Sequence, residues 1–344
     1  MIKGEEVSIK VHCIVSSLCE VIREQSHIDY RPFYFGLWDA PFDVTVEGEF
    51  TYYQHDLNHQ HYYTSFERLF GAKVHVWYDF EAGCEANFTR LKDLVEHSPQ
   101  ERYVAAQIDM SLMPERENKF SQKPFPHFLI LRSTSEEQEW LMIDADFRWR
   151  GVVPVHKVKE AFVGNAFGGG FYVDANELQE AAPQRVEEYA AAVFRKENAL
   201  TMRLKEIIEE MVRGRNGLSI EQLTRAVRQL PVLAIRKYSY EHALMYFLDE
   251  TDEDDSMFET YCDRIEELVK GYHQVQYMCI KMGMTKNGKL LEGVLSKLEE
   301  MDRIEASIKQ EVQRLYHIWR RKMLEDASQG QNPQHVLMRE ERAR

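Results

Sequence analysis

The stretch HFLILRSTSEEQEWLMIDADF, residues 127–147, consists of two apolar runs separated by a short polar segment. The first run covers 127–134, the second covers 139–147, and EEQ at 136–138 has the composition of a hairpin tip. Short apolar runs that are rich in β-branched and aromatic residues and bounded by polar segments are typical of strands. We therefore expect an antiparallel hairpin here, within a domain that contains an antiparallel sheet.

The predicted hairpin brings a histidine and an aspartate together. His127 opens the first strand, and Asp144 lies near the end of the second. In an antiparallel pair the start of one strand adjoins the end of the next, so the two side chains are expected to be close. A carboxylate beside an imidazole holds the tautomer that a general base needs. Asp146 has the same parity along the strand and is the alternative partner; an ordinary loop histidine is the alternative reading of His127.

A candidate nucleophile lies near the start of the chain, in IKVHCIVSSLCEVI (9–22). Apolar residues at helical spacing predict a helix over 13–24 that begins at Cys13. The helix dipole and the free N–H groups at such a start favour a thiolate, and the backbone there could help to bind an oxyanion. Cys19 lies on the edge of the apolar stripe and is expected to be packing, which is also the alternative role for Cys13. The sequence thus predicts a Cys13/His127/Asp144 triad.

The remaining pattern changes in character near residue 180. Before that point, strand-like runs at 73–80, 102–110 and 166–174 and a helical segment at 88–97 indicate an α+β domain. After it, apolar residues recur at helical spacing, ending in a long helix over 288–326. Two capping boxes are predicted, at Ser219 with Gln222 and at Ser256 with Glu259. We expect an α+β domain over 1–180, a helical domain over 181–327 and a disordered tail over 328–344.

Two other segments have the composition of a binding site. YRPFYFGLWDAPF (30–42) is rich in aromatic rings, and Phe35 and Trp38 are candidates for a pocket that holds a flat aromatic group. Asp39, in the same segment, is a candidate to hold a cationic amine, although acidic loops are common. HDLNHQHYY (55–63) gathers three histidines but lacks the partners of a known metal motif, so it is predicted to be a polar surface loop.

Composition excludes several classes of protein. The net charge of −14 argues against nucleic-acid binding and suits a cationic small molecule or partner. Five cysteines, without metal-ligand spacing, argue against a disulfide framework and against a metal site. The absence of a long apolar run or a leader segment predicts a cytoplasmic protein that does not enter a membrane.

Several of these segments also carry a resemblance to a known family. They occur in the order found in the butirosin biosynthesis protein H family, which itself resembles papain-like cysteine enzymes: VHCIVSSLCEVI (11–22), FYFGLWD (33–39), AAQIDMSLMP (105–114), HFLIL (127–131) and MIDADF (142–147). Over nearly its whole length the chain resembles the proteins of petrobactin biosynthesis. The resemblance implies a papain-like domain followed by helices, with Cys13 as nucleophile, His127 as base and Asp144 as its orienting partner. Asp109 matches an aspartate of the family with a structural or pocket-lining role.

What the resemblance implies about function is specific. It implies a siderophore-biosynthesis acyltransferase that moves a 3,4-dihydroxybenzoyl group from an aryl carrier protein to the amine of a polyamine, spermidine. The phosphopantetheine belongs to the carrier, so no cofactor of the chain's own is expected, and the pathway's synthetases are expected partners. Papain-like hydrolases place a glutamine shortly before the cysteine, whereas Lys10, Val11 and His12 stand here; another donor or the backbone must complete the oxyanion hole. A papain-like thioesterase or amide hydrolase, or a non-catalytic scaffold for the carrier, is the alternative.

Overall fold

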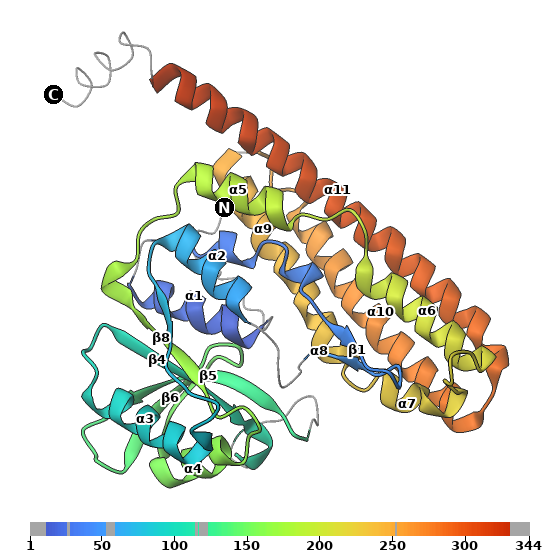
Figure 1. Ribbon diagram of the computed structural model, residues 1–344. Helices are drawn as coiled ribbons and strands as arrows, with labels where there is room; N and C mark the ends of the chain where they lie inside the picture. The colour runs from blue at the N-terminus through green and yellow to red at the C-terminus, as the bar shows by residue number, and fades with distance from the viewer. Residues whose placement is uncertain are drawn as a thin grey trace.

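The structure is a computed structural model that describes residues 12–25, 28–52, 59–113, 116, 123–251 and 253–330. A part built around a sheet lies beside a part built of long helices (Figure 1). The fold class is therefore α+β, as predicted. Of the helices in these ranges, none combines the length and the apolar character that a bilayer crossing requires.

One six-stranded sheet forms the centre of the first part. Its strand order is β3–β8–β4–β5–β6–β7, and all neighbours are antiparallel. The strands are β3 (Val74–Val76), β4 (Arg102–Asp109), β5 (Pro126–Ser133), β6 (Glu139–Asp144), β7 (Trp149–Pro154) and β8 (Gly170–Asp174). The predicted hairpin is formed by β5 and β6, in which Ile130 pairs with Ile143 and Ser133 with Trp140.

The alternation of side chains along the strands creates two cores, one on each face of the sheet. Phe128 and Ile130 of β5 belong to the core beneath α1, whereas Leu129 and Leu131 belong to the core beneath α3 and α4. These three helices are α1 (Cys13–Gln25), α3 (Gly83–His97) and α4 (Val155–Val163). Both faces are thus covered, and α1 places its first residue beside β5.

The second part is a set of packed helices. Its α-helices are α5 (Pro183–Val193), α6 (Ala199–Arg213), α7 (Leu223–Ala226), α8 (Leu230–Ala234), α9 (Ser239–Thr251), α10 (Phe258–Thr285) and α11 (Leu291–Gly330). A short 3-10 helix, η6 (Ile235–Tyr238), joins α8 to α9. The two longest helices, α10 and α11, lie side by side, and α9 packs against α11 (Figure 1).

The first core continues without a break into the helical part. The segment that carries it across includes two short 3-10 helices, η1 (Arg31–Tyr34) and η2 (Leu37–Asp39), and it packs against α9 and η6. Phe35 and Trp38 from this segment share one buried cluster with Phe247 and Trp319 of the helices. At about 25 cal/mol per Å² of apolar surface removed from water, such aromatic residues contribute strongly to holding the two parts together.

Several local predictions can be compared with the structure. The capping box of Ser219 and Gln222 is present, but that of Ser256 and Glu259 is wrong: the Ser256 hydroxyl donates to Asp254 (2.6 Å), and α10 begins only at Phe258. Helix α11 continues through Gly330, so the first three residues of the expected disordered tail are helical, and residues 331–344 lie outside the described ranges. The sequence patterns did not predict α2 (Gln60–Phe70), β7, α4 or the small ribbon of β1 (Asp43–Val44) and β2 (Phe50–Thr51).

Candidate active site

Cys13 is the first residue of α1 and is half-buried. Asp146, in the turn after β6, holds this helix end: its Oδ1 accepts hydrogen bonds from the His12 N–H (3.2 Å) and the Ser16 hydroxyl (2.6 Å). A carboxylate at this place accepts a hydrogen bond from a free N–H at the helix start and interacts favourably with the positive end of the helix dipole. Asp146 therefore fixes the position from which the Cys13 side chain enters the site.

His127 and Asp144 form the pair predicted from the hairpin. Nε2 of His127 donates to Oδ1 of Asp144 at 2.9 Å, and both side chains are buried. Asp144 is the last residue of β6, whereas Asp146 already lies in the following turn and is engaged with α1. The partner of the imidazole is thus Asp144 and not the alternative, Asp146.

Asp144 is itself held by two further donors. Its Oδ1 also accepts the Phe147 N–H (3.1 Å), and its Oδ2 accepts Nη2 of Arg116 at 2.8 Å. The Arg116 guanidinium stacks over the Trp149 ring, 4.2 Å from its centroid. A fully buried carboxylate needs such partners to stay ionised. Burial raises the pKa of Asp144, but His127 and Arg116 outweigh it, so the net shift is downward.

The charges in the site favour a protonated His127. Burial alone would lower its pKa, but the Asp144 carboxylate and a hydrogen bond with Cys13 raise the pKa of His127 well above its ordinary value of 6.5. Since Nε2 is bonded to Asp144, Nδ1 is the ring nitrogen left for the Cys13 thiol. An imidazolium next to a cysteine at a helix start is the arrangement that produces a thiolate nucleophile. Phe125 and Phe147, with ring centroids 5.6 and 5.5 Å from that of His127, shield the pair from water.

Two further histidines lie beside triad residues in the structure: His12 precedes Cys13, and His59 packs on Phe128, the residue after His127. The His12 ring packs on Tyr62 (4.7 Å), and the His59 ring packs edge-on against Phe128 (5.5 Å). Burial, aided by nearby positive charge, lowers the pKa of His12 well below 6.5 and that of His59 to about 4. Both imidazoles are therefore neutral at pH 7. The predicted polar surface loop is wrong for His59, because the start of α2 turns this residue inward; His55 lies outside the described residues.

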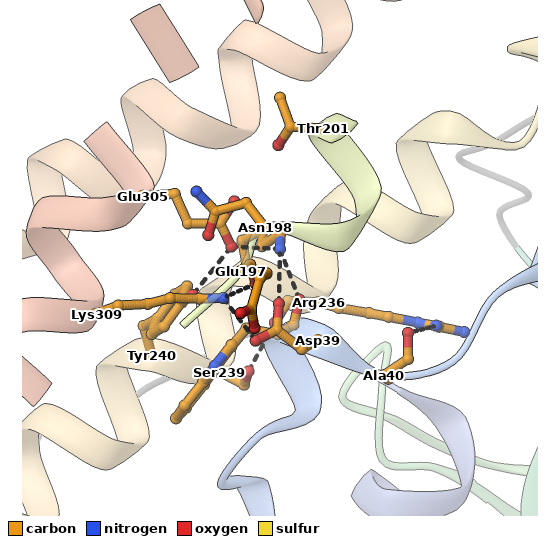
Figure 2. A network of polar contacts seen from close by, with 12 residues as sticks. Asp39, Ala40, Glu197, Asn198, Thr201, Arg236, Ser239, Tyr240, Glu305 and Lys309 are labelled. Carbon is orange, nitrogen blue, oxygen red and sulfur yellow. Dashed lines mark hydrogen bonds and ion pairs between the residues drawn. The ribbon is translucent and has the colours of Figure 1, made fainter. Parts of the chain in front are cut away.

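The residues predicted to bind substrate are not brought to the triad. Trp38 stacks on Tyr240 (4.2 Å), and Phe35 packs against Phe247 (5.1 Å). Asp39 pairs with two lysines of the helical part: with Lys309 at 2.7 Å (Figure 2) and with Lys237 at 3.7 Å. This segment therefore joins the two parts of the molecule, and the two lysines balance the negative charge of Asp39.

Asp109 also has a local structural role. Its Oδ1 accepts the N–H groups of Ser111 and Phe125, both at 2.9 Å, and so ties the chain that leaves β4 to the chain that enters β5. Because Phe125 packs next to His127, Asp109 acts on the site through the backbone. This arrangement agrees with the structural role considered for Asp109 and gives no support to a pocket-lining one.

A cavity of about 510 Å³ borders Asp144 between α1, η1, the β6–β7 turn and α9. Its wall includes Glu20 and Glu24 of α1, Tyr34 of η1, Arg150 of β7 and His242 of α9. Both carboxylates are paired with Arg150, so the wall carries charges of both signs. Among the residues that the structure describes, no cluster of His, Cys, Asp and Glu side chains is arranged to hold a metal ion.

Comparison with known proteins places the chain in a family. Residues 8–178 match the model of the DUF6005 N-terminal domain, and residues 184–333 match that of the DUF6005 C-terminal domain. The chain belongs to the DUF6005 family. It is 47% identical over 314 residues to petrobactin synthase of Bacillus anthracis, an alignment that covers 91% of this chain and 96% of the relative. The predicted relationship to the petrobactin-biosynthesis proteins is thereby confirmed.

Proposed function

We propose that this protein is a siderophore-biosynthesis acyltransferase that forms an amide. It takes a 3,4-dihydroxybenzoyl group from the thioester of an aryl carrier protein and transfers it to a primary amine of a polyamine such as spermidine. Two observations support the proposal: the juxtaposition of Cys13, His127 and Asp144, and the 47% identity to petrobactin synthase. The first observation supports the reaction type, and the second supports the assignment to siderophore biosynthesis.

The first half-reaction transfers the acyl group to the enzyme. The Cys13 thiolate attacks the thioester carbonyl and forms a new C–S bond. The carrier's phosphopantetheine sulfur leaves as the old C–S bond breaks, and it takes the proton from the His127 imidazolium. His127 is then neutral, with its Nε2 still bonded to Asp144. The product is an acyl-Cys13 enzyme beside a general base.

The second half-reaction forms the amide. A neutral amine attacks the acyl-Cys13 carbonyl and gives a proton to Nδ1 of His127, while the C–S bond breaks and returns the Cys13 thiolate. The imidazolium–thiolate pair is thereby restored, so the cycle consumes no cofactor. Water would compete with the amine for the acyl-enzyme, and the phenyl rings of Phe125 and Phe147 beside His127 help to exclude it. The net charge of −14 suits a cationic acceptor.

Intact mass spectrometry on the full-length protein tests the proposal. Exposure to aryl-loaded carrier should add one acyl group to the wild-type protein and to Cys84→Ser, a control at another half-buried cysteine, but not to Cys13→Ala. Addition of spermidine should then discharge the adduct as the amide. Free acid in the presence of amine would identify a hydrolase instead. Amide formation that persists in Cys13→Ala would overturn the nucleophile assignment, and no product together with insensitivity to His127→Ala would indicate a scaffold.

A further inference from the structure

The cavity of about 510 Å³ beside Asp144 has no role in the proposed reaction. It lies where the first part of the molecule meets the helical part, and its volume is in the range of about 300–1,000 Å³ that is usual for small-molecule sites. Of the three triad residues, Asp144 alone lies in its wall, and that carboxylate is held by His127 and Arg116. A ligand in the cavity would therefore lie beside the triad without contacting the Cys13 thiol.

His242 of α9 lies in the wall of this cavity with its hydrogen bonds unmade. The residue is only 2% exposed, and neither Nδ1 nor Nε2 has a partner within the described part of the chain. Burial and Arg31 lower its pKa to about 3, so at pH 7 the imidazole is neutral and has one donor and one acceptor nitrogen. Buried polar atoms without partners are unfavourable, and the hydroxyl group of a ligand can satisfy either nitrogen.

Aromatic rings form a large part of the same wall. The ring of Tyr34 stacks on that of His242, with centroids 3.9 Å apart and planes 8° apart, and Tyr30 meets both rings edge-on at 6.2 Å. Trp149 comes from the other side of the interface, at the start of β7, and the Arg116 guanidinium holds its ring from 4.2 Å. Aromatic rings interact favourably with further rings in stacked or edge-on geometry, so this wall suits a flat aromatic ligand.

The charges around the cavity favour an anion over a cation. Its two carboxylates on α1 are already paired: Glu20 with Arg23 at 2.7 Å, and Glu24 with Arg150. Arg148, in the β6–β7 turn, is exposed and has no ion pair with any carboxylate that the structure describes. Its backbone is left-handed (φ 47°), a conformation that glycine or asparagine adopts more readily, so the turn itself does not call for an arginine.

We propose that this cavity is a second ligand site, separate from the reaction centre, which binds a small hydroxylated aromatic acid of the hydroxybenzoate class. The ring lies among Tyr30, Tyr34 and Trp149, a ring hydroxyl bonds to His242, and the carboxylate faces Arg148 at the mouth. The proposal does not rest on acyl transfer, since none of these contacts uses Cys13. A polyamine is not expected here, because the wall offers it no unpaired carboxylate.

Isothermal titration calorimetry on the full-length protein tests the site with 3,4-dihydroxybenzoate and with benzoate, which lacks the ring hydroxyls. His242→Phe keeps the stack on Tyr34 and removes both nitrogens. It should raise the Kd of dihydroxybenzoate about tenfold, as for loss of one buried hydrogen bond, and that of benzoate by less than about twofold. Arg148→Gln should raise both Kd values about two- to fivefold, as for an exposed ion pair.

Two control variants complete the measurement. Arg264→Gln, at an exposed position of α10, and Cys13→Ala should both bind dihydroxybenzoate with wild-type affinity. Loss of binding in Cys13→Ala would place the acid at the reaction centre and overturn the proposal.

Absence of binding at millimolar dihydroxybenzoate would also overturn it, as would displacement of the acid by spermidine or unchanged Kd values in both His242→Phe and Arg148→Gln. Urea unfolding shows whether His242→Phe is folded; if it is not, the exposed Arg148→Gln decides by itself. The titration contains neither carrier nor amine. Should the acyl-transfer assay fail, the proposed function falls, but binding that depends on His242 and Arg148 still supports this second site.

Discussion

Nε2 of His127 is bonded to Oδ1 of Asp144 across a hairpin at 2.9 Å, although the two residues are 17 positions apart in the chain. The carboxylate is fully buried, and its other oxygen is held by Arg116. The imidazole is therefore oriented by a partner that cannot rotate away. We therefore expect the orientation of His127 to depend on this carboxylate.

Asp144→Asn should leave the fold intact and lower kcat/KM by about 10²–10⁴-fold, because the amide preserves the shape but removes the charge and can impose the wrong tautomer on His127. Steady-state amide formation measures the loss. Asp146→Asn provides the comparison. Asp146 lies in the turn that follows β6, and its carboxylate is bonded to α1 and not to the imidazole, so the loss of kcat/KM in this variant should be smaller. Equal losses in the two variants would show that the Asp144 pairing has no special role.

The raised pKa of His127 also predicts a pH-dependent stability. A histidine whose folded pKa lies above its unfolded value of about 6.5 stabilises the fold fully below pH 6.5, and the contribution is lost as pH rises through the folded pKa. We expect the difference in free energy of unfolding between a Cys13→Ala protein and Cys13→Ala/His127→Gln to be largest near pH 6 and to shrink toward pH 9. Urea titrations measure it, and a difference that grew with pH would contradict the charge assignment.

His242 should show the opposite sign. It stacks on Tyr34 with ring centroids 3.9 Å apart, and neither ring nitrogen has a hydrogen-bond partner among the residues that the structure describes. Burial together with Arg31 lowers its pKa to about 3. Below pH 6.5 this histidine takes up a proton in the unfolded chain but not in the folded protein, so the free energy of unfolding falls as the pH decreases. His242→Phe keeps the stack and removes this penalty. Its gain in unfolding free energy over wild type should grow by about 2 kcal/mol between pH 7 and pH 5.

The control for that measurement is His156→Gln, at an exposed position of α4. Its stability curve should run parallel to that of the wild type over the same pH range. Parallel curves for His242→Phe as well would mean that His242 is solvated or protonated in the folded protein.

Lys237 and Glu305 should prove strongly coupled. Both are buried, and Tyr240 donates a further hydrogen bond to Glu305 at 3.0 Å. Nζ of Lys237 donates to Oε1 of Glu305 at 2.5 Å. Lys237→Met therefore leaves the buried Glu305 carboxylate without this cation and should cost about 3–5 kcal/mol of unfolding free energy. Lys237→Met/Glu305→Gln removes both charges and should recover at least about 1 kcal/mol relative to the sum of the single losses. Additive losses in urea unfolding would argue against a buried ion pair.

The triad could be predicted from sequence because its determinants are local. Strand polarity places the start of one strand beside the end of the next, so His127 and Asp144 follow from the hairpin, and Cys13 follows from the helix period and the position of the helix start. The same local rules predicted both ends of β4, β5 and α1 to within one residue, whereas the run predicted at 139–147 ends at Asp144 in β6. Asp144 prevails over Asp146 because β6 ends between them, and a strand end is what periodicity defines least well.

The contacts between the two parts of the chain could not be predicted in this way. Phe35 and Trp38 have the composition of an aromatic pocket, but packing against the helices buries them, a tertiary effect that local patterns do not contain. Arg116 gave no signal either, since a single basic residue in a loop is usually solvated. Only the structure shows that it holds Asp144.

The ion pairs of Asp39 with Lys237 and Lys309 have a consequence for engineering the enzyme. A fragment ending near residue 180 would retain the sheet and the triad, but it would lose both lysines and leave the rings of Phe35 and Trp38 facing water. Such a fragment should aggregate rather than work as a minimal catalyst. Exchange of helical parts between relatives should succeed only when the segment 38–41 is exchanged with them, so the exchangeable module of this enzyme is discontinuous in sequence.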